Sequence, residues 1–491
     1  MPFGLAAVLL ALCFAISLCT AVYSPLPLLG LLGIGLGALV FFFPAYGLMA
    51  VFTLFLIQLS PAYLKYGVFA RSITAADVIG LLVVFGWVRQ ELSVGRAPDR
   101  GLQIGGTLRS SHNAAMAAVG VYLLWQIVSV LWSTAPLTSD EAAIRGSGEA
   151  FALFALALLM LRTEKLARRA AGLYASTACV LAAYTIINFS SLGGFASATA
   201  QAALNSANYR GGLPDSANAN ELSIILACAP AFGFLAAAKM RKRVRYLLSA
   251  APLPLVALAI AILSSRETYV AIGVAVLVSV LVTRTFRYRL TVAVVLAVAG
   301  VAVFLALNAN SLPVWVTHRF TTADVGTLGA RAPFWIIALH LFAANPLGGL
   351  GFAGFEQVIP NYHVNAYLGV SATHNQYVNA LVDSGIIGFV LLLVMLVTLA
   401  RTVLRQGIQR PALVVNFVVV VVDMMAADLL QPHFAWVILA LVAACALSGA
   451  ETTVDLQPER GNADSGRHDT ASMGARIPTA PVSAWSHRGL P

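Results

Sequence analysis

Charged side chains are scarce in this chain. Only 10% of its 491 residues are Asp, Glu, Lys or Arg, whereas 59% are hydrophobic. Soluble domains carry about 25% charged residues, so this composition excludes a soluble globular fold. The apolar runs are also much longer than the roughly 9–11 residues of a membrane-spanning β-strand, which excludes a β-barrel. The sequence therefore predicts an all-α polytopic membrane protein.

Cysteine pairs and an N-terminal positive charge are missing as well. None of the five cysteines belongs to a Cys-x-x-Cys pair, and all of them lie in apolar runs. We therefore expect neither a disulfide framework nor a zinc site. The first apolar run, 3–22, has no Lys or Arg before it. A signal peptide would carry positive charge there, so we interpret this run as a retained helix.

Apolar runs of membrane-spanning length fill residues 1–450, which we interpret as one transmembrane domain of about 12–14 helices. Residues 451–491 are rich in Ser, Thr, Pro and Gly with mixed charge, and they predict a disordered cytoplasmic tail. The predicted spans lie near 3–22, 26–43, 45–62, 74–90, 113–132, 147–161, 170–188, 218–238, 246–263, 267–283, 290–307, 375–400, 412–428 and 431–449.

Basic residues divide the loops into two alternating sets. The basic-rich set faces the cytoplasm by the positive-inside rule, which puts the large loop 308–374 on the outer face. Because the rule works against cations outside, the outer cations are the better candidates for binding an anion. The cytoplasmic set is Arg89, Arg96, Arg100, Arg109, Arg162, Lys165, Arg168, Arg169, Lys239, Arg241, Lys242, Arg243, Arg245, Arg284, Arg287, Arg289, Arg401, Arg405 and Arg410, and the outer set is Lys65, Arg71, Arg145, Arg210, Arg266, Arg319 and Arg331.

The outer loop 308–374 is rich in histidine and poor in acid. Mg²⁺ and Mn²⁺ prefer oxygen ligands, but the only acids of the loop are Asp324 and Glu356. We therefore expect no metal ion and no other cofactor. Guanidinium groups, which grip phosphate oxygens in pairs, are expected to neutralise any bound diphosphate. The loop contains His318, His340, His363, His374, Arg319 and Arg331.

The outer loop ends at Thr373-His374-Asn375-Gln376-Tyr377, and 378–399 then reads as an almost uninterrupted membrane helix. Ser371 or Thr373 is expected to cap this helix. The positive end of the helix dipole disfavours an imidazolium, so His374 should be neutral and able to accept a proton. Two other roles stay open for His374, a protonated phosphate ligand and a residue that only caps and packs.

A short helix is predicted inside the outer loop, over 331–342. Pro333 suits its first turn. Trp335, Leu339 and Phe342 recur at helical spacing and form an apolar stripe that suits the bilayer surface.

Two tight turns on the outer face carry candidate residues. In the turn 346–351, Gly349 and Gly351 either let the backbone approach a ligand or serve the loop geometry alone. In the turn that contains Ser264-Ser265, Arg266 either reaches lipid headgroups or points into a shared cavity. Pairing of Glu267 with Arg266 is the structural alternative to a functional role.

The last predicted hairpin carries polar residues near its outer end. They are Asp423, Asp428 and His433. Acids inside a membrane are functional candidates by default, but these lie close to helix ends, so we expect a boundary role.

The quoted segments together resemble one family, the O-antigen ligase and Wzy-type polymerase superfamily, over about 205–400. The match is carried by Arg331…Trp335…Asn345-Pro346-Leu347-Gly348-Gly349-Leu350-Gly351…Phe355, by Thr373-His374-Asn375-Gln376-Tyr377 and by Asp383-Ser384-Gly385-Ile386-Ile387-Gly388. Ser265-Arg266 and the region of Arg210 and Asn218-Ala219-Asn220 resemble its upstream signatures.

The resemblance implies a metal-independent, inverting glycosyltransferase on the outer face of the bacterial inner membrane. Its donor would be a glycan on undecaprenyl diphosphate, and its acceptor lipid A-core or another lipid-linked glycan. Carried over to this chain, the catalytic residues are His374 as base, with Arg266 and Arg210 on the diphosphate. The substrate-binding residues would be Arg331, Asn375, Tyr377, Gly349 and Gly351.

Two other functions stay open. The chain has about two more spans than the twelve usual for ligases, which keeps a Wzy-type O-antigen or exopolysaccharide polymerase possible. A polysaccharide or lipid transporter belongs to a different class. Transporters often show internal repeats and polar sites at mid-membrane, whereas the polar groups here collect on the outer face and no repeat is evident.

Overall fold

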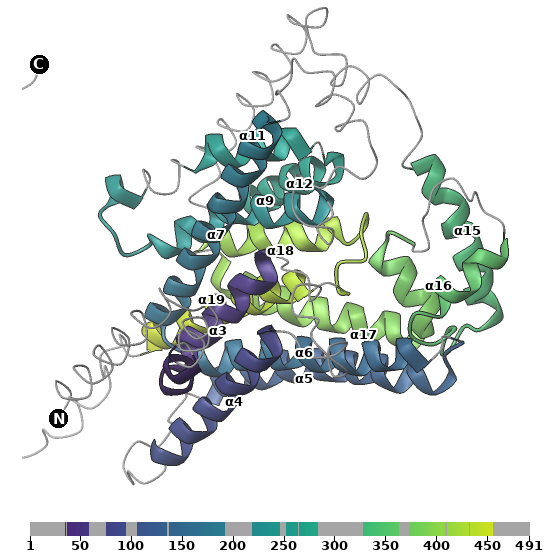
Figure 1. Cartoon of the computed structure of the whole chain (residues 1–491), viewed down its shortest axis with the longest axis horizontal. Helices are drawn as coiled ribbons and strands as arrows, with labels where there is room; N and C mark the ends of the chain where they lie inside the picture. Colours follow the sequence, from purple (N-terminus) through teal and green to yellow (C-terminus); the bar gives the residue numbers. More distant parts are fainter. Residues whose placement is uncertain are drawn as a thin grey trace, which may run out of the picture.

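The structure, a computed structural model, describes twelve parts of the chain, and all regular structure within them is helical (Figure 1). They are residue 35 and residues 37–57, 75–94, 106–134, 137–191, 219–245, 252–263, 265–282, 328–362, 373–407, 410–431 and 433–454. The predicted spans 3–22 and 290–307 and the tail residues 455–491 lie outside them. The helix α19 continues to Val454, into the first residues of the predicted tail.

The helices match the predicted all-α membrane fold. Three of them are long and apolar enough to cross a membrane, over Ser111–Trp132, Glu164–Ser191 and Gln376–Arg405, and seven shorter ones are also apolar. The elements are α3 (Pro44–Ile57), α4 (Ala75–Val94), α5 (Gly106–Ser129), η2 (Val130–Trp132), α6 (Leu137–Met160), α7 (Glu164–Ser191), α9 (Ala219–Ala236), α11 (Leu253–Leu263), α12 (Arg266–Val282), α15 (Leu328–Ala344), α16 (Gly354–Val358), η4 (Ile359–Tyr362), α17 (Gln376–Gly407), α18 (Pro411–Asp423) and α19 (His433–Val454).

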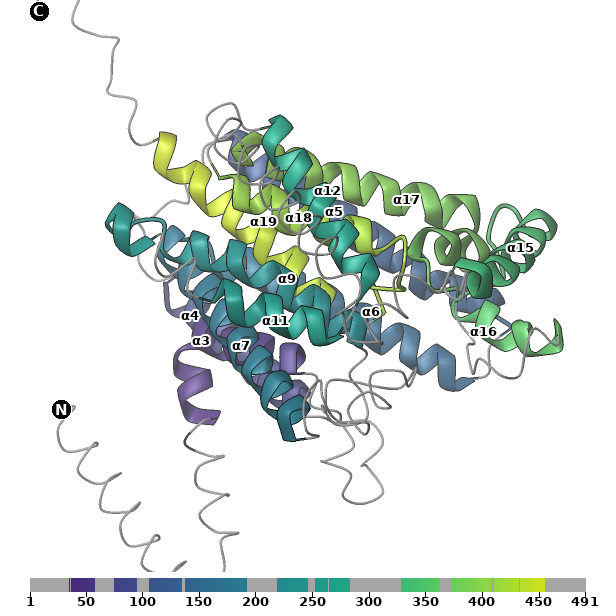
Figure 2. The ribbon, with the colours of Figure 1, turned by 90° about the horizontal axis from the view of Figure 1, so that it is seen from above.

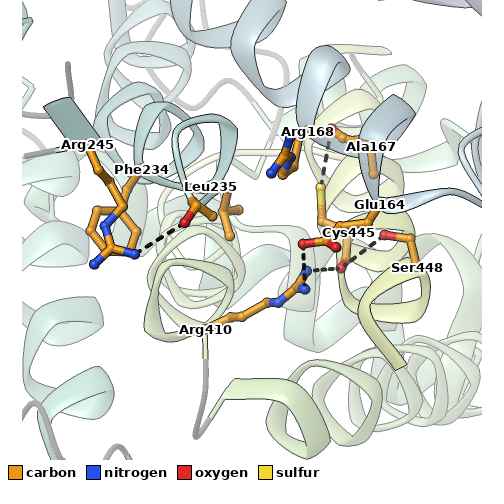
Figure 3. A pocket seen from close by; sticks show the side chains of 10 residues that line it. Glu164, Ala167, Arg168, Phe234, Leu235, Arg245, Arg410, Cys445 and Ser448 are labelled. Atoms are coloured by element: carbon orange, nitrogen blue, oxygen red, sulfur yellow. Dashed lines mark hydrogen bonds and ion pairs between the residues drawn. The ribbon is translucent and has the colours of Figure 1, made fainter. Parts of the chain in front are cut away.

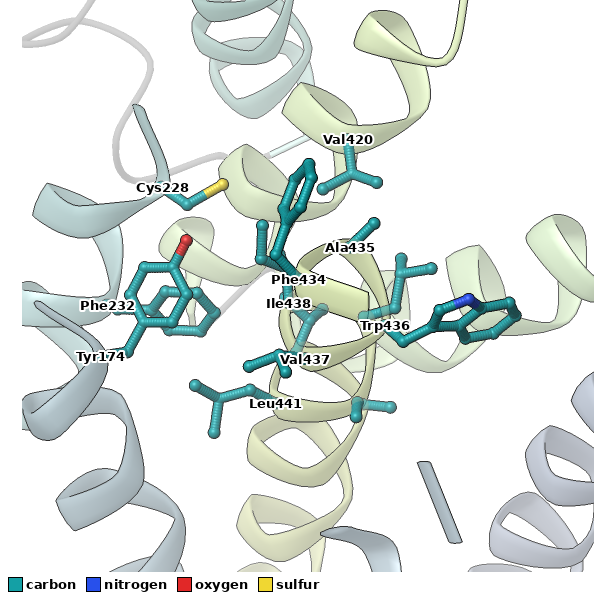
Figure 4. Close-up of a cluster of buried hydrophobic side chains, with 14 of the residues drawn as sticks. Tyr174, Cys228, Phe232, Val420, Phe434, Ala435, Trp436, Val437, Ile438 and Leu441 are labelled. Carbon is teal, nitrogen blue, oxygen red and sulfur yellow. The ribbon is translucent and has the colours of Figure 1, made fainter. Parts of the chain in front are cut away.

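The centre of the bundle is α19. Every residue from Phe434 to Leu447 is buried, and the helix packs against α3, α5, α6, α7, α17 and α18. A helix that is apolar on all faces belongs in an interior, and its many alanines let neighbouring backbones approach closely. Around it lie Tyr174 and Phe232, whose ring centroids are 4.5 Å apart, and Cys228 (Figure 4).

The bundle has two ends of different character. At one, which we call the α15 end, α15 and α16 lie beside the start of α17 (Figure 2), together with η2, residues 424–431 and residue 433. At the other, the basic end, contacts join residues 161–168, 236–245, 405–407, 410–411 and 445–448. Arg410 Nη2 lies 3.1 Å and Lys239 Nζ 2.6 Å from a Glu164 oxygen, and Arg405 donates to the Ser111 hydroxyl at 3.0 Å. These contacts agree with the division of the loops into two sets.

The helix α17 is broken at Gly385, where φ is 66° and ψ is −169°. The turn 346–351 enters this break. Ile386 N–H donates to Pro346 O at 2.9 Å, and Leu350 N–H donates to Val382 O at 2.8 Å. The turn thus satisfies backbone groups that the break frees, as a buried helix end requires.

The glycines in and opposite the break are needed sterically. A Cβ on Gly385 would lie 2.2 Å from Leu347 O, and one on Gly349 would lie 2.5 Å from Val382 O. A Cβ on Gly351 would lie 2.3 Å from Ser133 Cα. All three have positive φ, the region that glycine occupies at little cost. These contacts supply a packing reason for Gly349 and Gly351, and their substrate role stays a prediction.

The helix α15 covers the predicted range 331–342 but presents a different face. Its buried side chains are Phe334 and Ala338, which pack with Leu350, Phe355 and Val382. Leu339 is exposed. The face that packs on the protein is therefore not the predicted stripe, and the contact of that stripe with a bilayer surface stays a prediction.

Candidate functional site

The segment 373–377 turns into α17 through an asparagine cap. The Asn375 side-chain oxygen accepts the backbone N–H groups of Tyr377 and Val378 at 3.0 and 3.2 Å. Asn375 is thus the N-cap, one residue before the helix begins. The expected caps differ from this. Thr373 lies too early in the chain, and Ser371 is outside the described residues.

Asp428 holds the backbone at His374. Its two carboxylate oxygens accept the Thr373 hydroxyl at 3.1 Å and the His374 backbone N–H at 3.0 Å. His374 has a φ of 48°, a left-handed conformation that is uncommon for a residue with a Cβ. Such a conformation costs about 1–3 kcal/mol and persists only where the surroundings fix it. Asp428 supplies this constraint from the segment that follows α18.

Gln376 and Tyr377 bind the hairpin formed by α18 and α19. Gln376 N–H donates to Met424 O at 2.8 Å, and its side-chain oxygen accepts Leu430 N–H at 2.9 Å. The Tyr377 hydroxyl donates to Val421 O at 2.8 Å. The side chains of Asn375 and Tyr377 are therefore used within the protein, and their contact with substrate stays a prediction.

An ion pair between two helices lies close to His374. Arg331 Nη2 is 2.7 Å from a Glu267 oxygen, and the two side chains are only 16% and 19% exposed. Trp335, one turn along α15, donates its indole N–H to Thr373 O at 2.9 Å. These contacts tie α15 and the start of α12 to the His374 segment.

The structure gives Glu267 a partner other than the one considered from the sequence. Glu267 pairs with Arg331 on α15, whereas its neighbour Arg266 was the residue considered. Arg266 is the first residue of α12, so its backbone adjoins this ion pair. The Arg266 side chain and all of Arg210 lie outside what the structure describes.

Burial and charge favour a neutral imidazole. The pKa of His374 is lowered, first by burial and then by the positive charge of Arg331. This is the direction expected from the sequence, but the causes are tertiary. The pKa of Asp428 is raised to about 6 by burial, although the hydrogen bonds from Thr373 and His374 oppose this and nearby Glu356 reinforces it. At neutral pH the site thus pairs a neutral histidine with an ionised aspartate.

Further acids surround the segment. Burial raises the pKa of Glu356, which a hydrogen bond to Gln431 opposes. Asp383 is buried and accepts Phe355 N–H at 2.9 Å, so it anchors the start of α16. Among the described residues no three His, Cys, Asp or Glu side chains gather closely enough to hold a metal ion.

The remaining predicted residues lie apart from this segment or have other partners. His340 is exposed on α15, and His318 and His363 lie outside the described ranges. His433 Nε2 is 2.7 Å from a Glu149 oxygen and stacks on Phe55. Asp423 is buried at the end of α18. A boundary role alone does not describe Asp428, because its carboxylate also holds the backbone at His374. The only signal for this in the sequence was the position of Asp428 near the outer end of the last predicted hairpin.

The comparison with known families gives one match. Residues 251–393 match the family model described as O-antigen ligase. The match includes Glu267, Arg331 and His374 but ends before Asp428. No curated protein matches the chain.

Proposed function

We propose that this chain, whose residues 251–393 match the family model described as O-antigen ligase, transfers a glycan from undecaprenyl diphosphate to an acceptor hydroxyl. The proposed acceptor is lipid A-core, and the proposed location is the outer face of the bacterial inner membrane. The observation that carries the proposal is the fixed, neutral His374 beside the half-buried Arg331–Glu267 pair.

His374 is the proposed general base. A sugar hydroxyl is a poor nucleophile, and a positioned base contributes about 10²–10⁴-fold to such a reaction. The acceptor oxygen attacks the anomeric carbon, its proton passes to the imidazole, and the bond from that carbon to the diphosphate oxygen breaks with inversion. Undecaprenyl diphosphate leaves with the bonding electrons, and the imidazolium later returns its proton to water.

The leaving diphosphate needs positive charge placed in advance. Arg331 contacts Glu267 through Nη2, and a guanidinium has five N–H donors, so others remain for a phosphate oxygen. Arg266 and Arg210 are the proposed main ligands of the diphosphate. The proposed role of the half-buried Glu267 is to hold the Arg331 guanidinium in one orientation.

The proposal is tested by reconstituted transfer. Purified full-length protein is incubated with undecaprenyl-diphosphate-linked glycan and lipid A-core, and the product is measured by mass. His374→Asn is the sharpest variant, because Asn tolerates the left-handed conformation but its amide is not a base. We expect a loss of about 10²–10⁴-fold, with normal insertion and expression.

His340→Asn is the matched control, since His340 is exposed on α15 and should keep full activity. Near-normal transfer by His374→Asn would remove His374 from the role of base. Arg266→Gln and Arg210→Gln test the diphosphate ligands in the same assay. Strict dependence of transfer on magnesium or manganese would contradict the proposed chemistry.

The acceptor is tested by omission. With lipid-linked glycan alone, a ligase leaves the donor unchanged, whereas a polymerase lengthens the glycan on its carrier. Lengthening without lipid A-core would replace the ligase proposal by the polymerase one, with the same residues in the same roles.

A further inference from the structure

A cavity lies at the basic end of the bundle, at the other end from His374. Its volume is about 140 Å³, enough for a few waters or one tetrahedral anion. Its wall is formed by α7, α9 and α19, by residues 238–245 after α9, and by Arg410, the residue before α18 (Figure 3). The lining residues are Glu164, Ala167, Arg168, Phe234, Leu235, Ala238, Arg245, Arg410, Cys445 and Ser448.

Positive charge exceeds negative charge in this cavity. In the part of the chain that the structure describes, its charged lining residues are three arginines, Arg168, Arg245 and Arg410, and one acid, Glu164. Glu164 is already bound by Arg410 at 3.1 Å and by Lys239 at 2.6 Å. The cavity therefore has a net positive charge that its own acid does not balance.

Two of the three arginines are held in place by the protein. Arg245 donates to Ala238 O at 3.3 Å, and its guanidinium lies 5.2 Å from the centre of the Phe234 ring. Arg410 donates to Glu164 and, at 3.3 Å, to Cys445 O. Their positions are fixed before any ligand enters, which lowers the entropic cost of binding.

The third arginine lacks acceptors. Nε and Nη1 of Arg168 are buried, and no acceptor in the described part of the chain is within hydrogen-bond distance of either. Buried N–H donors of a charged group that stay unpaired are costly. An anion with several oxygens in the cavity would satisfy them, and a guanidinium binds phosphate oxygens through two parallel N–H groups.

We propose that this cavity binds the phosphate group of an anionic ligand, either a phospholipid headgroup from the leaflet at the basic end or free phosphate. The bound phosphate accepts from Arg168 and is attracted by Arg245 and Arg410. By the positive-inside rule this end faces the cytoplasm, where the leaflet is rich in anionic lipids. Such a ligand joins α7, α9, α18 and α19, and so stabilises the folded bundle.

The test is a thermal-shift titration of the delipidated, full-length protein in neutral detergent. Phosphatidylglycerol, phosphatidylethanolamine and inorganic phosphate are added separately, and the melting temperature is measured by intrinsic fluorescence. We expect phosphatidylglycerol to raise it more than phosphatidylethanolamine does. In Arg168→Gln the midpoint of the titration should move to at least about tenfold higher ligand, because one charge-assisted pair is lost.

Lys165→Gln is the matched control. Lys165 lies one turn before Arg168 on α7, is exposed and does not line the cavity, so its titration should follow wild type. Arg168→Lys keeps the charge but loses the paired donors, and its midpoint should lie between those of wild type and Arg168→Gln. If Arg168→Gln does not fold, the comparison of Arg168→Lys with Lys165→Gln replaces it.

The two sources are separated by the arms of the experiment. A rise with phosphatidylglycerol but not with inorganic phosphate assigns a lipid headgroup, and a rise with inorganic phosphate that depends on Arg168 assigns free phosphate. The proposal is overturned if neither ligand raises the melting temperature, or if Arg168→Gln and Lys165→Gln respond alike. Glycan transfer by Arg168→Gln should stay near wild type, so this test is independent of the proposed function.

Discussion

The two ends of the bundle use arginine in opposite ways. At the α15 end, Arg331 and Arg145 each contact an acid, Glu267 and Glu149, at 2.7 and 2.6 Å. At the basic end, three arginines share one acid around a cavity, and buried N–H groups of Arg168 have no acceptor within the described ranges. The first arrangement is set by the protein alone, whereas the second is completed by an anion.

The two ends also differ in the regularity of their backbone. The α15 end contains the broken helix α17, the glycine turn that enters the break, and His374 in a left-handed conformation. Strained and irregular backbone is maintained where surrounding contacts fix it, and it gathers at functional sites. At the basic end the described segments are helices and short turns. The comparison indicates that contacts at the α15 end fix the positions of particular side chains, whereas the basic end gathers positive charge.

The largest effect is expected from filling the break in α17. In Gly385→Ala the new Cβ would meet Leu347 O at 2.2 Å, and φ is 66°. We expect a destabilisation of about 3 kcal/mol or more, because backbone strain and a backbone clash add. Gly273→Ala on α12 is the control, since its Cβ meets nothing within 4 Å. Melting temperatures of the two variants measure the difference, and similar values would mean that the break is not a fixed feature.

A smaller loss is expected when the support of His374 is removed. Asp428→Ala leaves the imidazole in place but removes the acceptor of its backbone N–H. We expect kcat to fall about tenfold to a hundredfold, a fraction of the full contribution of a base. The apparent KM should change little, and Asp428→Asn, which keeps one acceptor oxygen, should recover part of the rate. Equal losses in kcat and in folded protein would instead mean a purely structural role.

The positions of the helices were predictable, because they follow from local composition. The predicted spans 113–132 and 431–449 agree within two residues with the apolar helices Ser111–Trp132 and His433–Ser448. The predicted span 375–400 begins one residue before the apolar helix Gln376–Arg405 and ends five residues before it does. Long apolar runs dictate helices in lipid whatever packs beside them. The break at Gly385 was not predicted, since 378–399 reads as one run. It depends on carbonyl groups of the turn 346–351, which lies far upstream.

The contacts between segments that are distant in the sequence could not be predicted. The histidine and Arg331 were found from their loop, but their partners Asp428 and Glu267 come from other helices. Asp428 was expected to have only a boundary role near a helix end, and Glu267 was considered only as a partner of its neighbour Arg266. The Asn375 cap was within reach, since Asn is a preferred cap and stands directly before Gln376.

The pH dependence of glycan transfer tests whether the paired arginine Arg331 acts on His374. A base works when deprotonated, so activity should rise with pH through the lowered pKa of His374. Arg331 is one cause of that lowering. Arg331→Gln removes the positive charge and should therefore raise the pKa of His374 and move the acid limb to higher pH. Arg331→Lys keeps the charge and should leave the limb in place, although kcat falls. If the acid limb of Arg331→Gln stayed in place, the charge of Arg331 would not be a cause of the lowered pKa of His374.

The smallest effect is expected at the rim of the basic end. Lys239 contacts Glu164 at 2.6 Å but its side chain is 61% exposed, and an exposed ion pair contributes only about 0.2–1 kcal/mol. Lys239→Gln should therefore hardly change the melting temperature. Glu164→Gln removes the only acid among the described residues that line the cavity, so it should lower stability without ligand and strengthen binding of the anion. If Glu164→Gln weakened phosphatidylglycerol and phosphate binding instead, the cavity would be a site for ion pairing within the protein, and the contrast between the two ends would be lost.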